Sequence, residues 1–434
     1  MNIWLFLNKY LSLKIFMDSQ KIKVLQITPY YPPHKWWLEL VAFQRSQNWT
    51  ESGSWNVLNI TTSLGQEEIL DKIWNTQGFT KIWENYYSPV CYKNRVVGYN
   101  FSLDWISAVY QVLCLPSFDV IPNFPFPKFW TGEFRYVFLL AKQFDPDVIQ
   151  THTRFFLTSF FGWLFARKHK KKRVHIEHGS DFVRLKNKFF SFIAYAYDQS
   201  LGKFVFAKAD KIIAISDACK KFIQQNFKKK EVEVIYNWTD FKTIQQIQPD
   251  LEFKKKFPDK IIVWALGRLI QWKWFHNFVQ AYYLLPRHIQ EKVQFVLIWW
   301  WEEFENLKKL DTKNKIYFTG LVSFQQAISI QKIFDIYVHC SYKWWGLATT
   351  ILQAMALWNF IVSTYNEGAD EVIFDWRNGI IIWDSSAQNI AAGLIEALKL
   401  LPQKEKYAAR SQKILETSFD PLINIKKYYS IYLK

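Results

Sequence analysis

Short runs of aliphatic and β-branched residues alternate along the chain with longer segments of helical periodicity. The runs predicted as strands are residues 21–28, 57–61, 148–152, 173–178 and 211–215 in the first half, and 261–266, 295–298, 316–319, 336–340, 360–363 and 379–382 in the second. Strands that alternate with helices form parallel βαβ units. The pattern therefore predicts an α/β protein with two doubly wound, Rossmann-like domains.

The length of 434 residues exceeds the range in which one hydrophobic core keeps growing. Residues 239–258 are polar, rich in Gln and Lys, and contain Pro249 and Pro258, which is typical of a linker. We therefore expect an N-terminal domain over 18–240, a C-terminal domain over 241–410, and a helix over 411–434 that packs back toward the first domain. Residues 66–130 are less regular and become Pro-rich toward their end, which suggests an insertion near the acceptor side.

The formal net charge is +17, and basic residues cluster at 168–173 (KHKKKR) and 228–230. Such clusters attract anionic lipid head groups or nucleic acid, whereas a general compositional bias toward lysine would explain them without any partner. The sequence contains no zinc pattern, aromatic RNP sequence or helix-turn-helix, so we expect no nucleic-acid partner.

The four cysteines are scattered without C-x-x-C pairs, which argues against a disulfide framework and for a reducing compartment. No apolar run approaches the ~18–20 residues that a membrane span needs. We expect a cytoplasmic protein whose basic first domain is able to rest on the inner face of the membrane.

The counts of glycine and tryptophan are unusual. Glycine occurs 14 times and tryptophan 22 times, although glycine normally makes up about 7% of a chain. Tryptophans stand at 36–37, 238 and 299–301, in turns and strand exits where glycine is expected because it reaches positive φ. We hypothesise a genetic code in which UGA specifies glycine. Trp55, Trp105 and Trp163 remain interpretable as genuine core residues.

Two strand exits in the second half carry residues suited to phosphate. Gly267, Arg268 and Lys273 follow the strand at 261–266 and combine a close-approach position with two cations. Thr349 and Thr350 stand near the start of a helix that follows the strand at 336–340, where hydroxyls and free backbone N–H groups can bind phosphate oxygens. A solvated basic turn is the alternative interpretation of the first group.

Three motifs in this order resemble the GT4 family of retaining glycosyltransferases. They are G-R-L-x-x-x-K from Gly267, C-S-x-x-x-x-G-L-x-x-T-x-L-Q-A-M-A from Cys340, and G-A-D-E-V-I from Gly368, and the similarity runs from about residue 21 to about residue 400. The resemblance implies a GT-B fold, with two Rossmann-like domains facing a central cleft. It also implies transfer of a sugar from a nucleotide-diphosphate donor to a hydroxyl of a glycan or lipid-linked acceptor, without a metal or other cofactor.

The resemblance also assigns roles in the second domain. Arg268 and Lys273 would neutralise the departing diphosphate. Donor contacts would come from Gly267, Thr349, Thr350, Gln353 and Glu371. The family usually has two glutamates eight residues apart, and these positions fall here on Trp345 and Gln353. Gln353 retains hydrogen bonding without charge, whereas an indole at Trp345 does not replace a carboxylate.

In the first domain, Pro32-Pro33-His34-Lys35-Trp36-Trp37-Leu38-Glu39 resembles the family loop P-P-x-x-G-G-x-E beside the diphosphate and acceptor, which assigns Trp36, Trp37 and Glu39 to it. The family places a histidine like His178 at the reacting centre, with His152 and Asp181 as neighbouring candidates. A strand-end histidine is also commonly structural.

The sequence Asp145-Pro146-Asp147 spells the D-x-D of metal-dependent transferases, but its position before a buried strand predicts a turn. Two other functions share the phosphate loop. A GT-B nucleotide-sugar epimerase would need acid and base carboxylates near the sugar, and a non-catalytic nucleotide-sugar-binding protein would account for Trp345 and Gln353.

Overall fold

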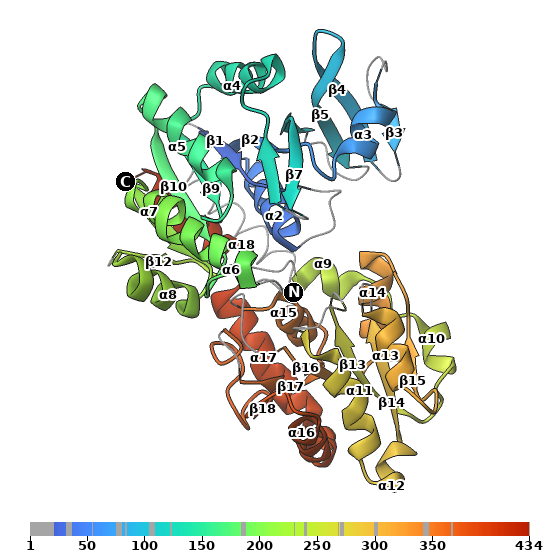
Figure 1. The fold of residues 1–434 in the computed structure, drawn as a ribbon. Coiled ribbons are helices and arrows are strands. Elements are labelled where there is room, and N and C mark those ends of the chain that lie inside the picture. Colours follow the sequence, from blue (N-terminus) through green and yellow to red (C-terminus); the bar gives the residue numbers. More distant parts are fainter. Residues whose placement is uncertain are drawn as a thin grey trace.

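The structure, a computed structural model, describes residues 21–31, 37–53, 55–74, 80–82, 85–103, 109–121, 124–183, 188–229, 231–237, 241–267, 269, 273–298, 303–341, 347–365 and 368–433. Two α/β domains stand one above the other, and each has a sheet between layers of helices (Figure 1). The predicted fold class, with two Rossmann-like domains, is confirmed.

The first domain contains a ten-stranded sheet in the order β12-β11-β10-β9-β1-β2-β6-β5-β4-β3. Its parallel strands are β1 (Ile22–Ile27), β2 (Trp55–Thr62), β6 (Val109–Leu115), β9 (Val148–His152), β10 (Lys172–Glu177), β11 (Lys211–Ala214) and β12 (Glu233–Val234). Strand β1 pairs with β2 on one side and with β9 on the other. This is the point at which the strand order reverses, and such points form the ligand sites of doubly wound sheets.

Helices cover both faces of this sheet, and its central strands β1 and β9 are therefore buried on both sides. One face packs against α2 (Trp37–Glu51) and the last helix, α18 (Pro421–Leu433), and the other against α4 (Gly132–Phe144) and α5 (Leu157–His169). The remaining elements of this domain are α3 (Glu67–Lys72), α6 (Lys188–Tyr197), the π-helix Asp198–Gly202, α7 (Lys203–Ala207) and α8 (Asp217–Phe227).

The region 66–130, predicted to be a less regular insertion, contains ordered strands in its described parts, and its place near the acceptor stays a prediction. Antiparallel strands β3 (Thr80–Ile82), β4 (Asn85–Tyr92) and β5 (Arg95–Leu103) extend the sheet beyond β6, and β7 (Ser117–Ile121) and β8 (Phe124–Pro127) form a separate hairpin. Prolines occur here because the strands have free edges. Pro89, for example, lies beyond the part of β4 that pairs with β3.

The second domain contains a parallel sheet in the order β15-β14-β13-β16-β17-β18. Its strands are β13 (Ile261–Leu266), β14 (Val293–Ile298), β15 (Ile316–Phe318), β16 (Ile336–His339), β17 (Phe360–Thr364) and β18 (Ile380–Ile382). One face carries α11 (Phe275–Leu284), α13 (Phe304–Leu310) and α16 (Ala387–Leu400), and the other carries α14 (Phe324–Gln331), α15 (Thr349–Ala356) and α17 (Lys404–Ser418). Short helices α12 (Arg287–Gln290) and Leu401–Gln403 complete the domain. The strand order reverses between β13 and β16.

The segment 239–258 was predicted to be a linker from its polar composition, but its described part is helical and packs on the second domain. It forms α9 (Phe241–Gln246) and α10 (Leu251–Lys255), and Phe241, Ile244 and Phe253 are buried in the core of the second domain. A few apolar residues at helical spacing thus anchor a segment that is polar on average.

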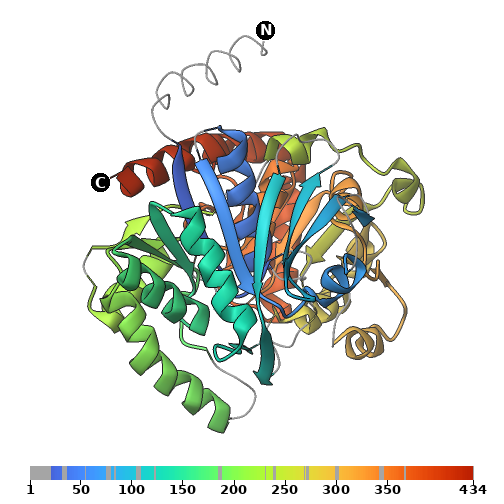
Figure 2. The ribbon, with the colours of Figure 1, turned by 90° about the horizontal axis from the view of Figure 1, so that it is seen from above.

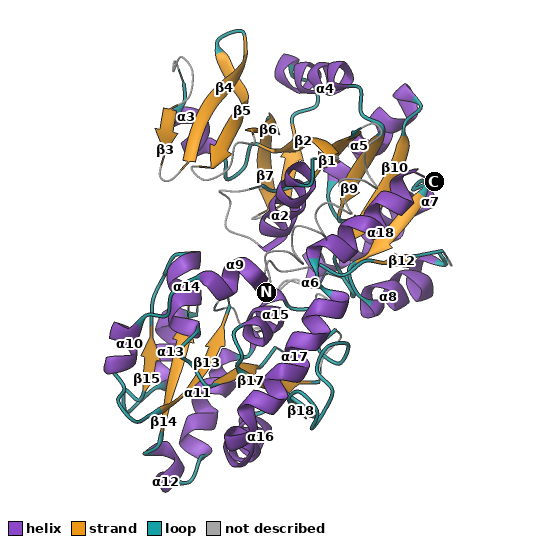
Figure 3. Cartoon of the chain, turned by 180° about the vertical axis from the view of Figure 1, so that it is seen from behind, coloured by secondary structure: helices purple, strands orange, loops and turns teal. Residues whose placement is uncertain are grey.

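The chain returns to the first domain at its end. Helix α17 belongs to the second domain, whereas α18 packs on the first, where Tyr428 and Tyr432 lie edge-on against the indole of Trp49. Trp49 is itself stacked on Trp55 at 4.8 Å between ring centroids. Figure 3 shows α17 and α18 from behind, one on each domain. Within the described residues, every helix is too short or too polar to cross a bilayer.

Candidate active site

The loops at the carboxyl ends of the two sheets contact each other. Glu371 follows β17 of the second domain, and its carboxylate accepts hydrogen bonds from the backbone N–H groups of Asp217 and Ala218, both at 2.8 Å. These groups start α8, directly after β11 of the first domain, where the helix dipole favours an anion. The interaction joins the domains across the strand ends. The predicted donor contact of Glu371 stays a prediction.

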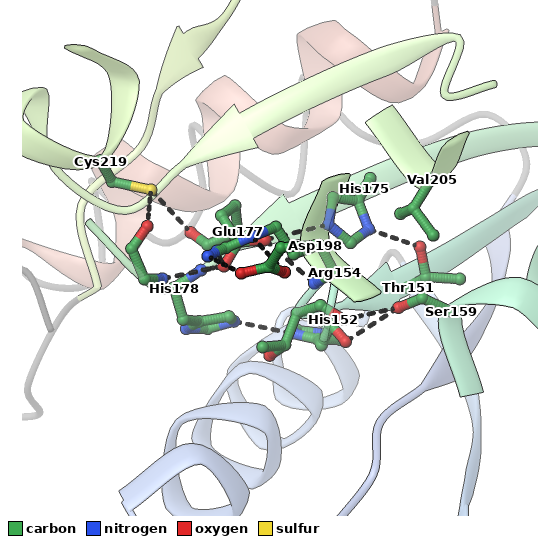
Figure 4. A network of polar contacts seen from close by, with 12 residues as sticks. Thr151, His152, Arg154, Ser159, His175, Glu177, His178, Asp198, Val205 and Cys219 are labelled. Carbon is green, nitrogen blue, oxygen red and sulfur yellow. Dashed lines mark hydrogen bonds and ion pairs between the residues drawn. The ribbon is translucent and has the colours of Figure 1, made fainter. Parts of the chain in front are cut away.

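Two histidines meet at the reversal point of the first sheet. His152 ends β9, and His178 directly follows the neighbouring strand β10. Both side chains are buried, with 2.9 Å between His152 Nδ1 and His178 Nε2 and 5.2 Å between the stacked ring centroids (Figure 4). The two histidines that the sequence singled out are therefore brought together.

Polar neighbours assign the protons of this pair. The Gln150 amide oxygen accepts from the Tyr432 hydroxyl, so its Nε2 group faces Gln26 Oε1 at 2.7 Å and His152 Nε2 at 2.6 Å. His152 Nε2 then accepts a hydrogen bond, and His152 Nδ1 carries the proton and donates to His178 Nε2. The last helix of the chain thereby orients a side chain beside the histidine pair.

Both histidines are neutral at physiological pH. Burial lowers the pKa of His152, and it lowers the pKa of His178 to about 3. The guanidinium of Arg45, on α2, lowers both pKa values further. A neutral imidazole is able to hydrogen-bond a hydroxyl without adding positive charge to the site.

Glu177 fixes the loop that carries His178. Its Oε1 accepts from the backbone N–H groups of His178 at 3.0 Å and Gly179 at 2.9 Å, and its Oε2 accepts from the N–H of Arg154 at 3.0 Å. Burial alone would raise the pKa of Glu177, but Arg154 and His175 hold it at about 2. The carboxylate is therefore ionised, and it connects the ends of β9 and β10 by accepting hydrogen bonds from both.

Arg154 joins Glu177 to a more distant segment. Its Nη1 lies 3.1 Å from Glu177 Oε1, while Nη2 and Nε lie 3.0 and 3.1 Å from the two carboxylate oxygens of Asp198. Nη2 also donates to the backbone carbonyl of Asp181 at 2.9 Å, and the guanidinium lies 4.8 Å from the ring centroid of Phe222. Asp181, a sequence candidate, thus meets Arg154 through its backbone.

Sequence reasoning missed four charged residues of this site: Arg45, Arg154, Glu177 and Asp198. Arg154 and Glu177 stand next to the strand-end motifs of His152 and His178, so their positions carried a signal. The other two lie within helical segments, where a charged residue is usually solvated, and nothing local marks them as buried.

In the second domain, Gly267 and Lys273 lie at the reversal point between β13 and β16. Gly267 has a φ of +154°, and a side chain there would stand 3.2 Å from the ring of Phe275. The backbone carbonyl of Lys273 accepts from Cys340 Sγ at 3.5 Å, at the end of β16. Burial lowers the pKa of the neighbouring His339 to about 3, and Lys273 contributes to this shift.

Helix α15 begins with the predicted threonines. Thr350 Oγ1 accepts from the Tyr337 hydroxyl at 2.7 Å, which ties the helix start to β16. Gln353 lies one turn later and is buried. Trp36, Arg268 and Trp345 lie outside the described residues. Trp37 and Glu39 belong to the first turn of α2, of which only the backbone is described.

Two facing Rossmann-like domains, joined at their strand ends and crossed by a C-terminal helix, define the GT-B class of glycosyltransferases. Residues 247–414 match the protein family described as "Glycosyl transferases group 1", and residues 104–242 match the family described as "Glycosyltransferase Family 4". An uncharacterized glycosyltransferase of Methanocaldococcus jannaschii, MJ1069, is 39% identical over 328 residues, which are 74% of this chain and 84% of that protein. The chain belongs to the group 1 glycosyltransferases.

A more distant relative and two solved structures are also similar to the chain. The lipopolysaccharide core biosynthesis glycosyltransferase LpsE of Rhizobium meliloti is 27% identical over 195 residues, 44% of this chain and 54% of that protein. The structure of Anabaena Alr3699/HepE in complex with UDP and glucose has a TM-score of 0.67 at 17% identity, covering 94% of this chain and 99% of that chain. A sucrose-phosphate synthase of Thermosynechococcus elongatus reaches 0.70 at 13% identity, covering 95% and 98%. These structures share the fold.

We predict that Arg154→Met lowers the free energy of unfolding of the first domain by about 3–5 kcal/mol, because it leaves two buried carboxylates without their cation. The matched control is Arg95→Met, which removes an exposed arginine 2.8 Å from Glu133 and should cost about 0–1 kcal/mol. Urea unfolding followed by circular dichroism measures both. Equal losses for the two variants would contradict the proposed importance of the buried ion pair.

We also predict that the stability of the protein falls as the pH falls below 6.5. The unfolded chain protonates His178 near its ordinary pKa of 6.5, whereas the folded protein does so only near 3. Between these values the unfolded state binds more protons, so the free energy of unfolding decreases with decreasing pH by up to ~1.4 kcal/mol per pH unit for each such histidine.

The test compares the pH dependence of unfolding of two variants, His178→Asn and His288→Asn. The second variant is the control, because His288 is an exposed histidine of α12. The pH dependence of urea unfolding should become shallower in the first variant and stay unchanged in the second. A slope that His178→Asn leaves unaltered would show that this histidine is not held neutral by the fold.

Proposed function

We propose that the protein is a retaining glycosyltransferase that moves a hexosyl group from a nucleotide-diphosphate sugar to a hydroxyl of a glycan or lipid-linked acceptor. The observation that carries the proposal is the contact of Glu371 with the start of α8, which joins the carboxyl ends of the two sheets. The first sheet carries the neutral pair His152 and His178 at its strand ends, and the second carries Gly267 and Lys273 at its reversal point. The contact of Glu371 with α8 supports their mutual orientation.

The chemistry of the two sites is complementary. The bond between the anomeric carbon and the diphosphate breaks, and the departing oxygen takes the electron pair. The oxygen of the acceptor hydroxyl forms the new bond to the anomeric carbon, and its proton passes to the departing diphosphate. Lys273, together with Arg268, neutralises this growing charge, which is the kind of interaction that lowers a transition-state barrier most. His178, neutral and oriented by His152, hydrogen-bonds the sugar or the attacking hydroxyl. Binding of UDP and UDP-glucose by structural neighbours supports a nucleotide-sugar donor.

We infer that cationic side chains take the place of a metal in this reaction and that no cofactor is needed. The acidic pair of the D-x-D sequence has structural partners: Asp145 binds Lys171 Nζ at 2.7 Å, and Asp147 accepts from the N–H of Lys23 at 2.8 Å. Both contacts anchor the turn that leads into β9.

A role in cell-envelope glycan synthesis is supported by the likeness to a lipopolysaccharide core transferase. The basic clusters at 168–173 and 228–230 are suited to an anionic membrane surface. We therefore place the reaction in the cytoplasm, with the first domain near the membrane.

We also propose that several tryptophans of the sequence are glycines in the functioning protein. Trp274, Trp358 and Trp376 have φ values of 56°, 61° and 57°, a left-handed conformation that is an outlier for a bulky residue. Trp358 ends α15, with Asn359 N bonded to Ala354 O at 3.1 Å, which is the helix-ending geometry that glycine dominates. The suspect positions 36, 238 and 299–301 lie outside the described residues.

Other tryptophans fit their sites as indoles. Trp264 is buried and donates from Nε1 to Asn359 Oδ1 at 2.5 Å. Trp55 is stacked on Trp49, and Trp163 lies edge-on to Phe204. Trp105 lies outside the described residues. The proposal therefore separates tryptophans in the left-handed conformation from tryptophans with ordinary backbone angles and packed indoles.

The proposed transfer is tested with Lys273→Met and with Lys309→Met as the control on an exposed lysine of α13. The rate of nucleoside-diphosphate release from UDP-, GDP- and ADP-sugars should fall by about 10²–10³-fold in the first variant, because a cation at the leaving group is lost. The control should keep the rate of the parent chain.

A thermal-shift screen with the same donors accompanies these rates. Binding without turnover in the parent chain would favour a non-catalytic nucleotide-sugar-binding protein, and interconversion of the free nucleotide sugars would favour an epimerase. Absence of binding to every donor would overturn the proposal.

The recoding proposal is tested by the codons and by peptide masses from the native cell. We expect UGA codons and glycine residues at 274, 358 and 376, and UGG codons and tryptophan at 49, 55 and 264. Replacing the three left-handed tryptophans by glycine should raise the free energy of unfolding by about 1 kcal/mol or more per site. UGG codons at the three positions would refute the proposal.

A further inference from the structure

Helix α6 presents its largest apolar side chains to solvent. Phe189 and Phe192 are 66% and 67% exposed, and Phe190, Ile193 and Tyr195 are also exposed. Soluble helices normally bury such a face and expose polar residues. Figure 2 shows α6, in green, extending outward from the first domain. The side chains of α6 that face solvent are therefore of the kind that a surface helix normally buries against the core.

Small and polar residues attach this helix to the domain. Ser191 is half-buried, and Ala194 and Asp198 are buried at helical spacing. Asp198, in the π-helix that directly follows, binds Arg154 through both carboxylate oxygens. The helix is thus held at its base by a buried ion pair, while its aromatic side chains stay available.

The apolar surface continues from the base of α6 onto the hairpin β7–β8. Tyr197 lies edge-on to Phe124 of β8 and to Phe155, at 6.0 and 5.4 Å between ring centroids. Further along the hairpin region are three exposed aromatic residues: Phe118, Phe129 and Trp130. Two neighbouring elements of one domain therefore expose aromatic side chains, more than scattered surface residues would.

Positive charge borders this surface. Lys188 starts α6 and Lys203 starts α7, and both lysines are exposed. The only acidic residue among the described residues 188–208 is Asp198, which is buried and ion-paired. Exposed aromatic residues flanked by uncompensated lysines are the composition of helices that insert into anionic membrane interfaces.

We propose that α6 and the hairpin β7–β8 form a membrane-docking surface that inserts its aromatic side chains into an anionic lipid bilayer. With ten residues, α6 is about 15 Å long, which is half of the ~30 Å hydrocarbon thickness. The helix therefore enters one leaflet without spanning the bilayer. Self-association through this face would bring Lys188 and Lys203 of two chains together, which like-charge repulsion opposes.

The location of α6 links docking to the candidate active site. Arg154, which binds Asp198 at the base of α6, also binds Glu177, the carboxylate that holds the His178 loop. An acceptor held in the leaflet would thus be presented on the side of the domain where His178 lies. The docking inference does not depend on the transfer reaction, because lipid binding is measured without a donor.

The test is co-sedimentation of the full chain with vesicles made of equal parts of phosphatidylglycerol and phosphatidylcholine. The doubly substituted variant Phe189→Ser, Phe192→Ser should bind these vesicles more weakly by roughly tenfold or more, because two aromatic side chains no longer leave water. The matched control, Phe324→Ser with Phe374→Ser, changes two exposed phenylalanines of the second domain and should bind as the parent chain does.

Charge is tested separately with Lys188→Gln and Lys203→Gln. Each should weaken binding to the anionic vesicles by about fivefold, with little effect on pure phosphatidylcholine vesicles. Circular dichroism and the rate of nucleoside-diphosphate release in detergent-free buffer, which the surface substitutions should leave unchanged, establish that the variants are folded.

Equal vesicle binding by the α6 variant and its second-domain control would overturn the proposal. A parent chain that is dimeric by light scattering, becomes monomeric on Phe189→Ser with Phe192→Ser and does not bind vesicles would also overturn it, in favour of a second copy as the occupant. Absence of donor turnover in the parent chain and in every variant, with vesicle binding intact, would leave docking standing and remove the proposed transferase function.

Discussion

The buried ion network of Arg154, Glu177 and Asp198 is the interaction on which the first half of the site depends. Three charges share a dry environment, and each is satisfied by at least one opposite charge or by backbone N–H groups. Such an arrangement adds little net stability compared with a well-packed apolar core, but it tolerates only one geometry. It therefore fixes the ends of β9 and β10 relative to each other, and with them the two histidines.

Much of the architecture was predictable because parallel strands are buried on both faces and appear as continuous apolar runs. Residues 148–152 and 261–266 were predicted with the observed bounds, and the other predicted strands with ends shifted by two residues at most. The antiparallel strands β3–β5 were not predicted, because they mix Tyr, Ser, Asn and Pro without a steady alternation of apolar and polar residues. The helices α9 and α10 were hidden in a segment whose average composition is polar.

The site was predictable where chemistry stands at strand ends, as for His152, His178 and Gly267. It was not predictable where a partner comes from a distant segment. Asp198 lies 44 residues from Arg154, and Arg45 reaches the histidines from a helix of otherwise ordinary composition. Burial, rather than residue type, distinguishes these charges from the solvated ones, and burial depends on the assembled fold.

Helix α18 has a consequence for the order in which the protein is completed. The chain leaves the first domain near residue 240 and returns at Pro421, so the first domain lacks the tyrosines that pack against Trp49 and Trp55 until residues 421–433 have been made. The domain that is synthesised first is therefore completed by a helix that the ribosome makes after the whole of the second domain.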